Sequence, residues 1–257
     1  MPKKDGWSRE QLVVAFKLYC EMPFGKMHSR NPEIIRFAKS IGRTPSALAM
    51  KLTNLASLDP EIRSTGRRGL SGASQADREI WEEMTSDWDR LPAEIARVEQ
   101  HFGIGLASER NEDSTDVPES YAGETRSAQI EARVGQSFFR RSVLSAYEFK
   151  CCITGLALPE LLVASHIVPW RADPGNRLNP KNGLCLSAIH DRAFDLGLIA
   201  ISDDLHILLS SRLGKSGANS FVGHAFRSYA GKTITPPEKF QPDSCFLRYH
   251  RENVFRG

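Results

Sequence analysis

Two short apolar runs followed by a helical pattern constrain the C-terminal half of this chain more than any other feature. The runs are LLVASHIV (161–168) and GLCLS (183–187), and the polar stretch between them is rich in Pro and Asn. Apolar runs of this length that are bounded by turn-forming residues predict strands. The segment AIHDRAFDLG (188–197) follows directly, and its closing Gly197 is typical of a helix end. We therefore expect a two-stranded ribbon packed against a helix over about 161–197.

Three polar side chains fall at set places in this ββα segment. His166 lies in the first run, Asn182 lies just before the second run, and His190 lies in the helical segment. A lone histidine in an apolar strand is more often a structural residue than a catalytic one. Two strands and a packed helix nevertheless bring these three side chains toward one space, which favours a common site.

The stretch SHIVPW…NPKNGLCLSAIHDRAFDLG closely resembles the HNH nuclease superfamily, with His166, Asn182 and His190 matching the three letters in order. RVGQSFFRRSVLSAYEFKCCITGL resembles the segment that precedes this unit in HNH restriction endonucleases, and the terminal FLRYHRENVF resembles their closing segment. WSREQLVVAFKLY…RTPSALAMKLTNLASLDP resembles a helical module found ahead of such domains. The resemblance implies a ββα-metal fold and a metal-dependent DNA endonuclease of restriction or defence type.

The resemblance also implies roles for these side chains. His166 is the expected general base, because a neutral imidazole can take the proton of the attacking water at physiological pH. His190 is the expected ligand of one divalent metal ion, with Mg²⁺ first and Mn²⁺ or Ni²⁺ as alternatives. Asn182 is expected to hold the loop and orient the base, with direct metal contact as the alternative. Asp195 either completes the metal shell or serves the turn at the helix end.

One position departs from the family pattern. Many HNH enzymes place Asp, Glu or His immediately before the base histidine as a metal ligand, whereas this chain has Ser165 there. A serine hydroxyl is a poor ligand for a hard divalent ion. The implied metal would then be held mainly by His190, water and the DNA phosphates, and Arg192 is a candidate phosphate contact.

The first hundred residues predict helices. Capping residues and apolar spacing indicate helices over 8–22, 31–42 and 43–59, and the last two form a helix-turn-helix-like pair. A further acidic helical region covers 76–102. Polar side chains off the apolar stripe of the pair are candidate DNA contacts, with a plain helical bundle as the alternative: Arg43, Ser46, Lys51 and Asn54. In the basic loop over 63–72, Arg67 and Arg68 are candidate phosphate contacts.

Residues 103–127 are polar and lack periodicity, which is typical of an interdomain linker. We therefore expect an α+β chain with a helical domain over 1–102, this linker, and an HNH endonuclease domain over 128–257. Residues 1–72 carry 13 Lys and Arg against 6 Asp and Glu, whereas residues 73–127 carry 5 against 14 and residues 128–257 carry 16 against 11. Two basic blocks around an acidic one favour double-stranded DNA as the partner, although a solvated surface explains such asymmetry equally well.

Cysteine usage and hydropathy exclude several other classes. Five irregularly spaced cysteines without a C-x-x-C pair indicate small buried residues in a reducing compartment and argue against a structural zinc knuckle. No apolar run approaches membrane-spanning length and no signal-peptide pattern is present, so a cytoplasmic protein without membrane contact is expected. A homodimer is expected because two active sites are needed to cut two antiparallel strands.

Two other functions fit parts of the pattern. A DNA-binding regulator with a degenerate HNH scaffold is the first, and Ser165 favours it, whereas two intact histidines argue against it. A nuclease toxin that degrades RNA is the second, although no delivery module is visible. Neither the recognition sequence nor any dependence on modified bases follows from the sequence.

Overall fold

A computed structural model describes residues 6–64, 72–104, 126–214 and 220–257 of the chain. The chain divides into two compact units, Met1–Phe139 and Arg140–Gly257, and the division falls inside helix α7, Arg126–Ala146. The predicted linker lies almost entirely outside the described residues, so a boundary there stays a prediction. The helical first part followed by a small strand-and-helix segment confirms the predicted α+β class.

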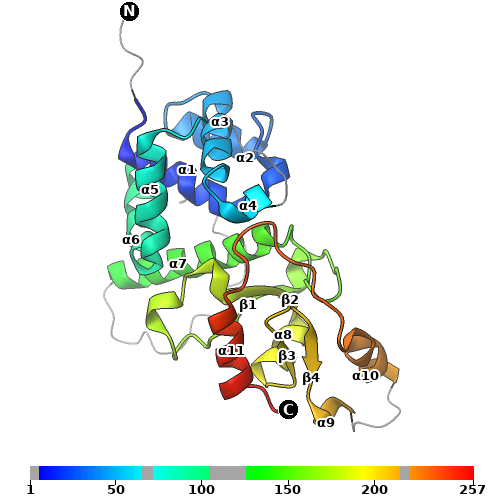
Figure 1. The fold of residues 1–257 in the computed structure, drawn as a ribbon. Coiled ribbons are helices and arrows are strands. Elements are labelled where there is room, and N and C mark those ends of the chain that lie inside the picture. Colours follow the sequence, from blue (N-terminus) through cyan, green and yellow to red (C-terminus); the bar gives the residue numbers. More distant parts are fainter. Residues whose placement is uncertain (1–5, 65–71, 105–125, 215–219) are drawn as a thin grey trace, which may run out of the picture. The chain divides into compact units, whose positions relative to one another are not determined.

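The helical unit contains the helices that the sequence predicts, and in addition the short α4, whose end overlaps the start of the predicted basic loop (Figure 1). Their bounds are α1 Arg9–Glu21, α2 Pro32–Ser40, α3 Pro45–Ala56, α4 Pro60–Ser64, α5 Gln75–Ser86 and α6 Leu91–Phe102. Side-chain caps begin α1, α2, α3 and α5, because the first backbone N–H groups of a helix lack partners within it. Ser8 and Gln11 form a reciprocal capping box on α1, and Thr44 caps α3.

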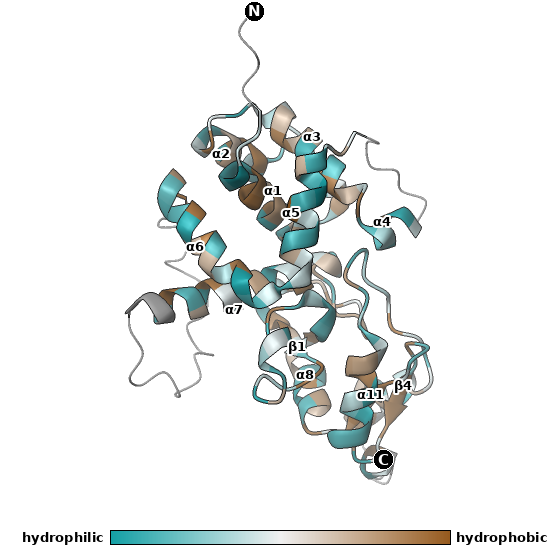
Figure 2. Cartoon of the chain, turned by 60° about the vertical axis from the view of Figure 1, so that its left-hand side comes forward, coloured by the Kyte–Doolittle hydropathy of each residue, from teal (hydrophilic) through white to brown (hydrophobic). Residues whose placement is uncertain are grey.

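Helix α1 forms the centre of this unit. Phe16, Leu18 and Tyr19 are fully buried, and α3, α5 and α6 all pack against α1. In Figure 2, α1 is brown along its middle, whereas α5 is largely teal. A helix that is apolar on most of its faces is stable only when neighbours cover those faces. Burial of α1 therefore organises the packing of the other helices.

The structure corrects the expected exposure of two candidate DNA contacts on α3. Lys51 and Asn54 are buried, and the Lys51 ammonium lies 2.7 Å from the Asp77 carboxylate of α5. The reason is that α5 packs on this side of α3 and covers it. The exposed face of α3 instead carries Ser46 and Met50.

The C-terminal unit contains the predicted ββα segment. Strand β1, Leu162–His166, pairs antiparallel with β2, Gly183–Ser187, so that His166 lies opposite Gly183. Helix α8, Ala188–Asp195, follows β2 directly and packs on both strands. Gly197 ends this helical segment with a φ of +68°, and a Cβ there would lie 2.0 Å from the Val254 carbonyl oxygen. Only glycine fits that position.

Short elements complete this unit. Strands β3, Ile199–Ile201, and β4, Ile207–Leu209, form the predicted second hairpin. Three helices follow among the described residues, and the sequence analysis predicted none of them: α9 Ser211–Gly214, α10 Ser220–Ala225 and α11 Ser244–Asn253. Among the described helices, none is both long and apolar enough to cross a bilayer.

Candidate active site

His166 closes strand β1, and its imidazole is held by the loop that follows. Its Nε2 lies 2.9 Å from the Arg177 carbonyl oxygen. A carbonyl oxygen only accepts hydrogen bonds, so Nε2 carries the proton and Nδ1 carries the lone pair of the neutral ring. Burial lowers the pKa of His166 below its usual value, and the bond to Arg177 opposes this effect only in part. The site therefore holds a neutral imidazole with a defined tautomer.

Asn182 ties the two ends of the same loop together. Its Oδ1 accepts a hydrogen bond of 2.8 Å from the Val168 N–H, and its Nδ2 donates to the carbonyls of Val168 and Asn176. The side chain is 1 % exposed. The Asn182 carbonyl also accepts from the N–H of Ile167, the residue after His166. These contacts fit the loop-holding role expected for Asn182.

His190 lies on α8, is 3 % exposed, and has partners at both ring nitrogens. The Ser187 hydroxyl lies 2.7 Å from Nδ1, and the Ala225 carbonyl oxygen lies 2.8 Å from Nε2. The carbonyl requires a proton on Nε2, so Nδ1 accepts the hydrogen bond from the hydroxyl. Burial lowers the pKa of His190 and keeps the ring neutral.

The described side chains do not form a metal shell in this conformation. Within the described ranges, no three His, Cys, Asp or Glu side chains lie together as metal ligands would. Metal binding through the Nε2 of His190 would require loss of its proton and of the Ala225 contact. The residues present therefore do not fit a closed metal site.

Ser165 and Asp195, the two further positions considered as metal ligands, differ in their surroundings. Ser165 is buried, and its hydroxyl makes no hydrogen bond within the described part of the chain. Asp195 is exposed at the end of α8, yet partial burial of its carboxyl raises its pKa to about 6, and the neighbouring Asp191 carboxylate adds to this shift. Among the described residues, Asp195 does not belong to any group of three or more potential metal ligands.

The remaining candidate contacts to DNA belong to both units of the chain. Arg192 is exposed on α8 and Ser46 is exposed on α3. Arg43 donates to the Gln11 side chain and to the Gly6 carbonyl, so its guanidinium is anchored within the helical unit. Arg67 and Arg68 lie outside the described residues.

Sequence reasoning missed the groups that hold the two imidazoles. The Arg177 and Ala225 carbonyls carry no side-chain signal, because any residue presents one. The Ser187 hydroxyl was detectable in principle, since it precedes His190 by three residues at the start of a helix. Trp170 lies in the quoted HIVPW stretch, and its ring contacts His166 edge to face.

Residues 151–202 match the family model described as HNH endonuclease. The matched region contains β1, β2, α8 and β3, and therefore all of His166, Asn182 and His190. It identifies an HNH endonuclease domain in the C-terminal unit. A comparison with curated proteins found no match.

Proposed function

We propose that this chain, through the HNH endonuclease domain at residues 151–202, is a DNA endonuclease of restriction or defence type. The single observation that carries the proposal is the state of His166 within that domain. Its neutral ring donates through Nε2 to the Arg177 carbonyl, so Nδ1 is the basic nitrogen. A general base in phosphodiester hydrolysis needs this combination of a fixed ring and a basic nitrogen.

The proposed chemistry assigns one task to each of two side chains. The Nδ1 of His166 takes a proton from the water that attacks the phosphorus, and the depressed pKa keeps that nitrogen unprotonated at neutral pH. Asn182 holds the loop that carries the acceptor for Nε2. The ring thus keeps one orientation while its charge changes during the reaction.

One divalent metal ion is the expected cofactor, because nucleases of this family typically use one. We propose His190 as its protein ligand, with Mg²⁺ preferred over Mn²⁺ and Ni²⁺. Such binding requires exchange of the Ala225 carbonyl for the ion at Nε2. Asp195 is retained only as a secondary candidate, because it is exposed at the end of α8.

We propose that the helical unit binds the DNA duplex through basic side chains around α2. Lys26, Arg30, Arg36 and Lys39 are all exposed in or just before this helix. On α3, the exposed Ser46 is kept as a candidate contact, whereas the buried Lys51 and Asn54 are not. Lysine and arginine contacts of this kind supply affinity that falls with salt.

Cleavage of plasmid DNA across Mg²⁺, Mn²⁺ and Ni²⁺ tests the proposal. The wild type is compared with His166→Ala on unmodified and on cytosine-modified DNA. We expect metal-dependent cutting that falls by about 10²- to 10⁴-fold in His166→Ala. His206→Ala is the matched control, because His206 is exposed in the same unit. Normal cutting by His166→Ala would show that the base is misassigned.

A DNA-binding regulator with an HNH scaffold is the second candidate function. Two observations favour it: the buried Ser165 hydroxyl makes no hydrogen bond to any described residue, and both nitrogens of His190 are already engaged. Tight site-specific binding without nicking under any metal would support this candidate. Preferential degradation of RNA in the same assay would instead indicate a toxin-type nuclease.

We also propose that the active form on DNA is a homodimer. Two sites related by a twofold axis match the two antiparallel strands of a duplex. Light scattering with and without DNA measures the assembly directly. A monomer under both conditions would exclude this arrangement.

A further inference from the structure

At the end of β1 and in the loop that leads to β2, three residues contact one another in a ring: His166, Trp170 and Arg177. The Arg177 carbonyl accepts the hydrogen bond from His166 Nε2. The guanidinium of the same residue donates from Nε to the Trp170 carbonyl at 2.8 Å, and its central carbon lies 5.1 Å from the centre of the Trp170 ring. The Trp170 ring in turn lies edge to face with the His166 imidazole, with 5.5 Å between ring centres.

We propose that Arg177 and Trp170 form a clamp that positions His166 and selects its tautomer. The guanidinium ties residue 177 to residue 170, and this tie fixes the carbonyl that receives the His166 proton. Arg177 is thus a positioning residue, since its side chain acts on His166 only through the loop. The catalytic consequence of the clamp rests on the proposed function of His166 as the general base.

The geometry distinguishes this role from direct binding of phosphate. An arginine that binds phosphate presents its guanidinium to solvent, whereas Arg177 is half-buried and uses its Nε and one face within the loop. Arg171 belongs to the same loop and is exposed. The two arginines therefore form a natural pair for comparison.

The loop depends on the clamp because its other anchor lies elsewhere. Asn182 holds the segment at the carbonyls of Val168 and Asn176. Arg177 follows Asn176 immediately, and the guanidinium supplies the link from this point back to Trp170. Without that link, the Arg177 carbonyl can turn away from Nε2, and the proton of His166 is then free to occupy either nitrogen.

The experiment compares Arg177→Lys with Arg171→Lys in the full chain. Lysine keeps the positive charge but has no planar fork that can donate from Nε while stacking on an indole. Nuclear magnetic resonance of ¹⁵N-histidine-labelled protein reports the tautomer of His166, with His166→Ala assigning the signal. We expect a protonated Nε2 in the wild type and in Arg171→Lys, and a mixture of tautomers in Arg177→Lys.

Cleavage kinetics supply the second measurement. We expect kcat to fall by up to about 100-fold in Arg177→Lys with KM unchanged, because a misplaced base affects the chemical step. Trp170→Phe keeps a ring edge near His166 and should retain more activity than Arg177→Lys. An unchanged tautomer in Arg177→Lys would overturn the clamp, as would a raised KM with normal kcat, which marks a phosphate contact.

The two measurements separate the clamp from the proposed function. If the wild type cuts no nucleic acid but Arg177→Lys mixes the tautomers, the clamp stands and the nuclease function fails. If the wild type cuts DNA and Arg177→Lys matches it in tautomer and in kcat, the clamp fails and the nuclease function stands.

Discussion

The two units of the molecule differ in how some of their buried polar groups are partnered. In the helical unit, two buried ammonium groups lie beside carboxylates on a neighbouring turn or helix. The Lys17 ammonium lies 2.8 Å from the Glu21 carboxylate, and Lys51 lies 2.7 Å from Asp77. Each pair is also hydrogen-bonded. Loss of one partner from such a pair leaves a buried charge without its counter-charge.

In the C-terminal unit, three imidazole rings with little exposure are bonded to backbone carbonyls instead. His166, His190 and His250 all place Nε2 within hydrogen-bond distance of a carbonyl oxygen. Burial lowers the pKa of each ring. A neutral imidazole bonded in this way keeps a second nitrogen that can act as an acceptor or a base.

His250 shows that this bonding alone does not identify a catalytic residue. It lies on α11, stacks on Phe194 at 3.7 Å between ring centres, and bonds the Phe194 carbonyl. Its Nδ1 is buried and has no hydrogen-bond partner in the part of the chain that the structure describes. What distinguishes His166 is its place at the end of a strand, beside a loop held by Asn182. The comparison therefore separates imidazoles that secure the fold from the one proposed to act on water.

Lys51→Met should produce the largest loss of stability, because it leaves the Asp77 carboxylate buried without its cation. We expect the free energy of unfolding to fall by about 3–5 kcal/mol. Urea unfolding followed by tryptophan fluorescence measures it, since three of the four tryptophans lie in the helical unit: Trp7, Trp81 and Trp88. Lys39→Met on the exposed face of α2 is the control and should have little effect.

A double variant sharpens this test of the helical unit. Asp77→Asn removes the charge but keeps an oxygen that can accept from the Ser74 N–H at the start of α5. Lys51→Met combined with Asp77→Asn should therefore regain most of the lost stability. A single variant as stable as the wild type would show that the ion pair contributes little.

His250 should make the C-terminal unit sensitive to acid. Burial and the Arg251 charge, against the opposing bond to Phe194, lower the pKa of His250 to about 4, whereas the unfolded chain has a pKa near 6.5. The unfolded state therefore binds the proton more readily, and stability falls as the pH drops from about 6.5 through about 4. The full effect is about 3 kcal/mol.

The measurement is the difference between the wild type and His250→Gln in urea unfolding at neutral pH and at a pH near 4. The difference cancels the titration of groups that both proteins share. We expect the wild type to lose more stability on acidification than the variant. Equal losses would mean that His250 does not hold its proton differently in the folded state.

The sequence predicted the architecture of the site because local signals there agree with the tertiary contacts. Short apolar runs bounded by turn-forming residues predicted β1 and β2, and the closing Gly197 predicted the end of the α8 segment, where a Cβ would meet the Val254 carbonyl. Caps predicted the helices of the first unit in the same way. Such signals depend on residues close in sequence.

Asn182→Ala should lower the free energy of unfolding by less than protonation of His250 does, although it changes the candidate active site directly. The change leaves the Val168 N–H and two carbonyls without their side-chain partner. One unsatisfied buried donor costs about 1–3 kcal/mol, so we expect a loss of about 2 kcal/mol together with reduced cleavage. Unfolding and cleavage assays are run beside Asn253→Ala, which alters an exposed α11 contact. Unchanged cleavage would contradict the loop-holding role.

The contacts that the sequence did not predict come from residues distant along the chain. The Ala225 carbonyl reaches His190 from 35 positions away, and Asp77 reaches Lys51 from 26 positions away. A helical wheel shows which residues share a face, but not which neighbouring helix covers it. This is why Lys51 was expected at a surface and Ala225 was not expected at the site.

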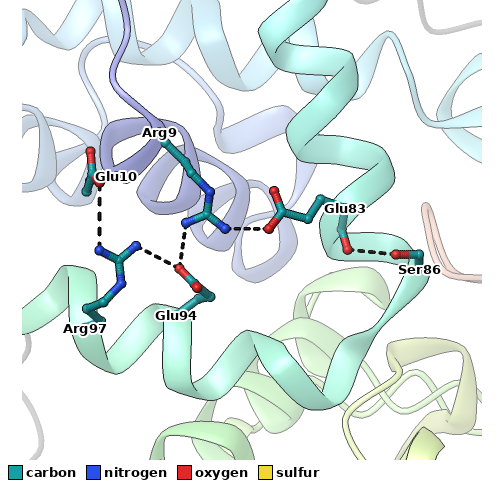
Figure 3. A network of polar contacts seen from close by, with 6 residues as sticks. All are labelled: Arg9, Glu10, Glu83, Ser86, Glu94 and Arg97. Carbon is teal, nitrogen blue, oxygen red and sulfur yellow. Dashed lines mark hydrogen bonds and ion pairs between the residues drawn. The ribbon is translucent and has the colours of Figure 1, made fainter.

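Arg9→Gln should have the smallest effect on the free energy of unfolding. It tests whether the ion pairs of the helical unit stabilise the fold only when they are buried. Arg9 joins α1 to Glu83 of α5 and Glu94 of α6, and Arg97 also contacts Glu94 (Figure 3). The Arg9 side chain is 38 % exposed, whereas that of Lys51 is 9 % exposed. Solvent and salt screen the exposed network, so we expect a loss below about 1 kcal/mol.

A double-mutant cycle of Arg9→Gln and Glu94→Gln in urea, at low and at high sodium chloride, measures the coupling between these two charges. The coupling should shrink as salt rises, whereas the effect of Lys51→Met should hardly change, because that pair is buried. A coupling of several kcal/mol that persists at high salt would show that the exposed network stabilises the fold as strongly as the buried pairs do. The contrast between buried and exposed charges in the helical unit would then fail, although the neutral imidazoles of the C-terminal unit would still differ from both.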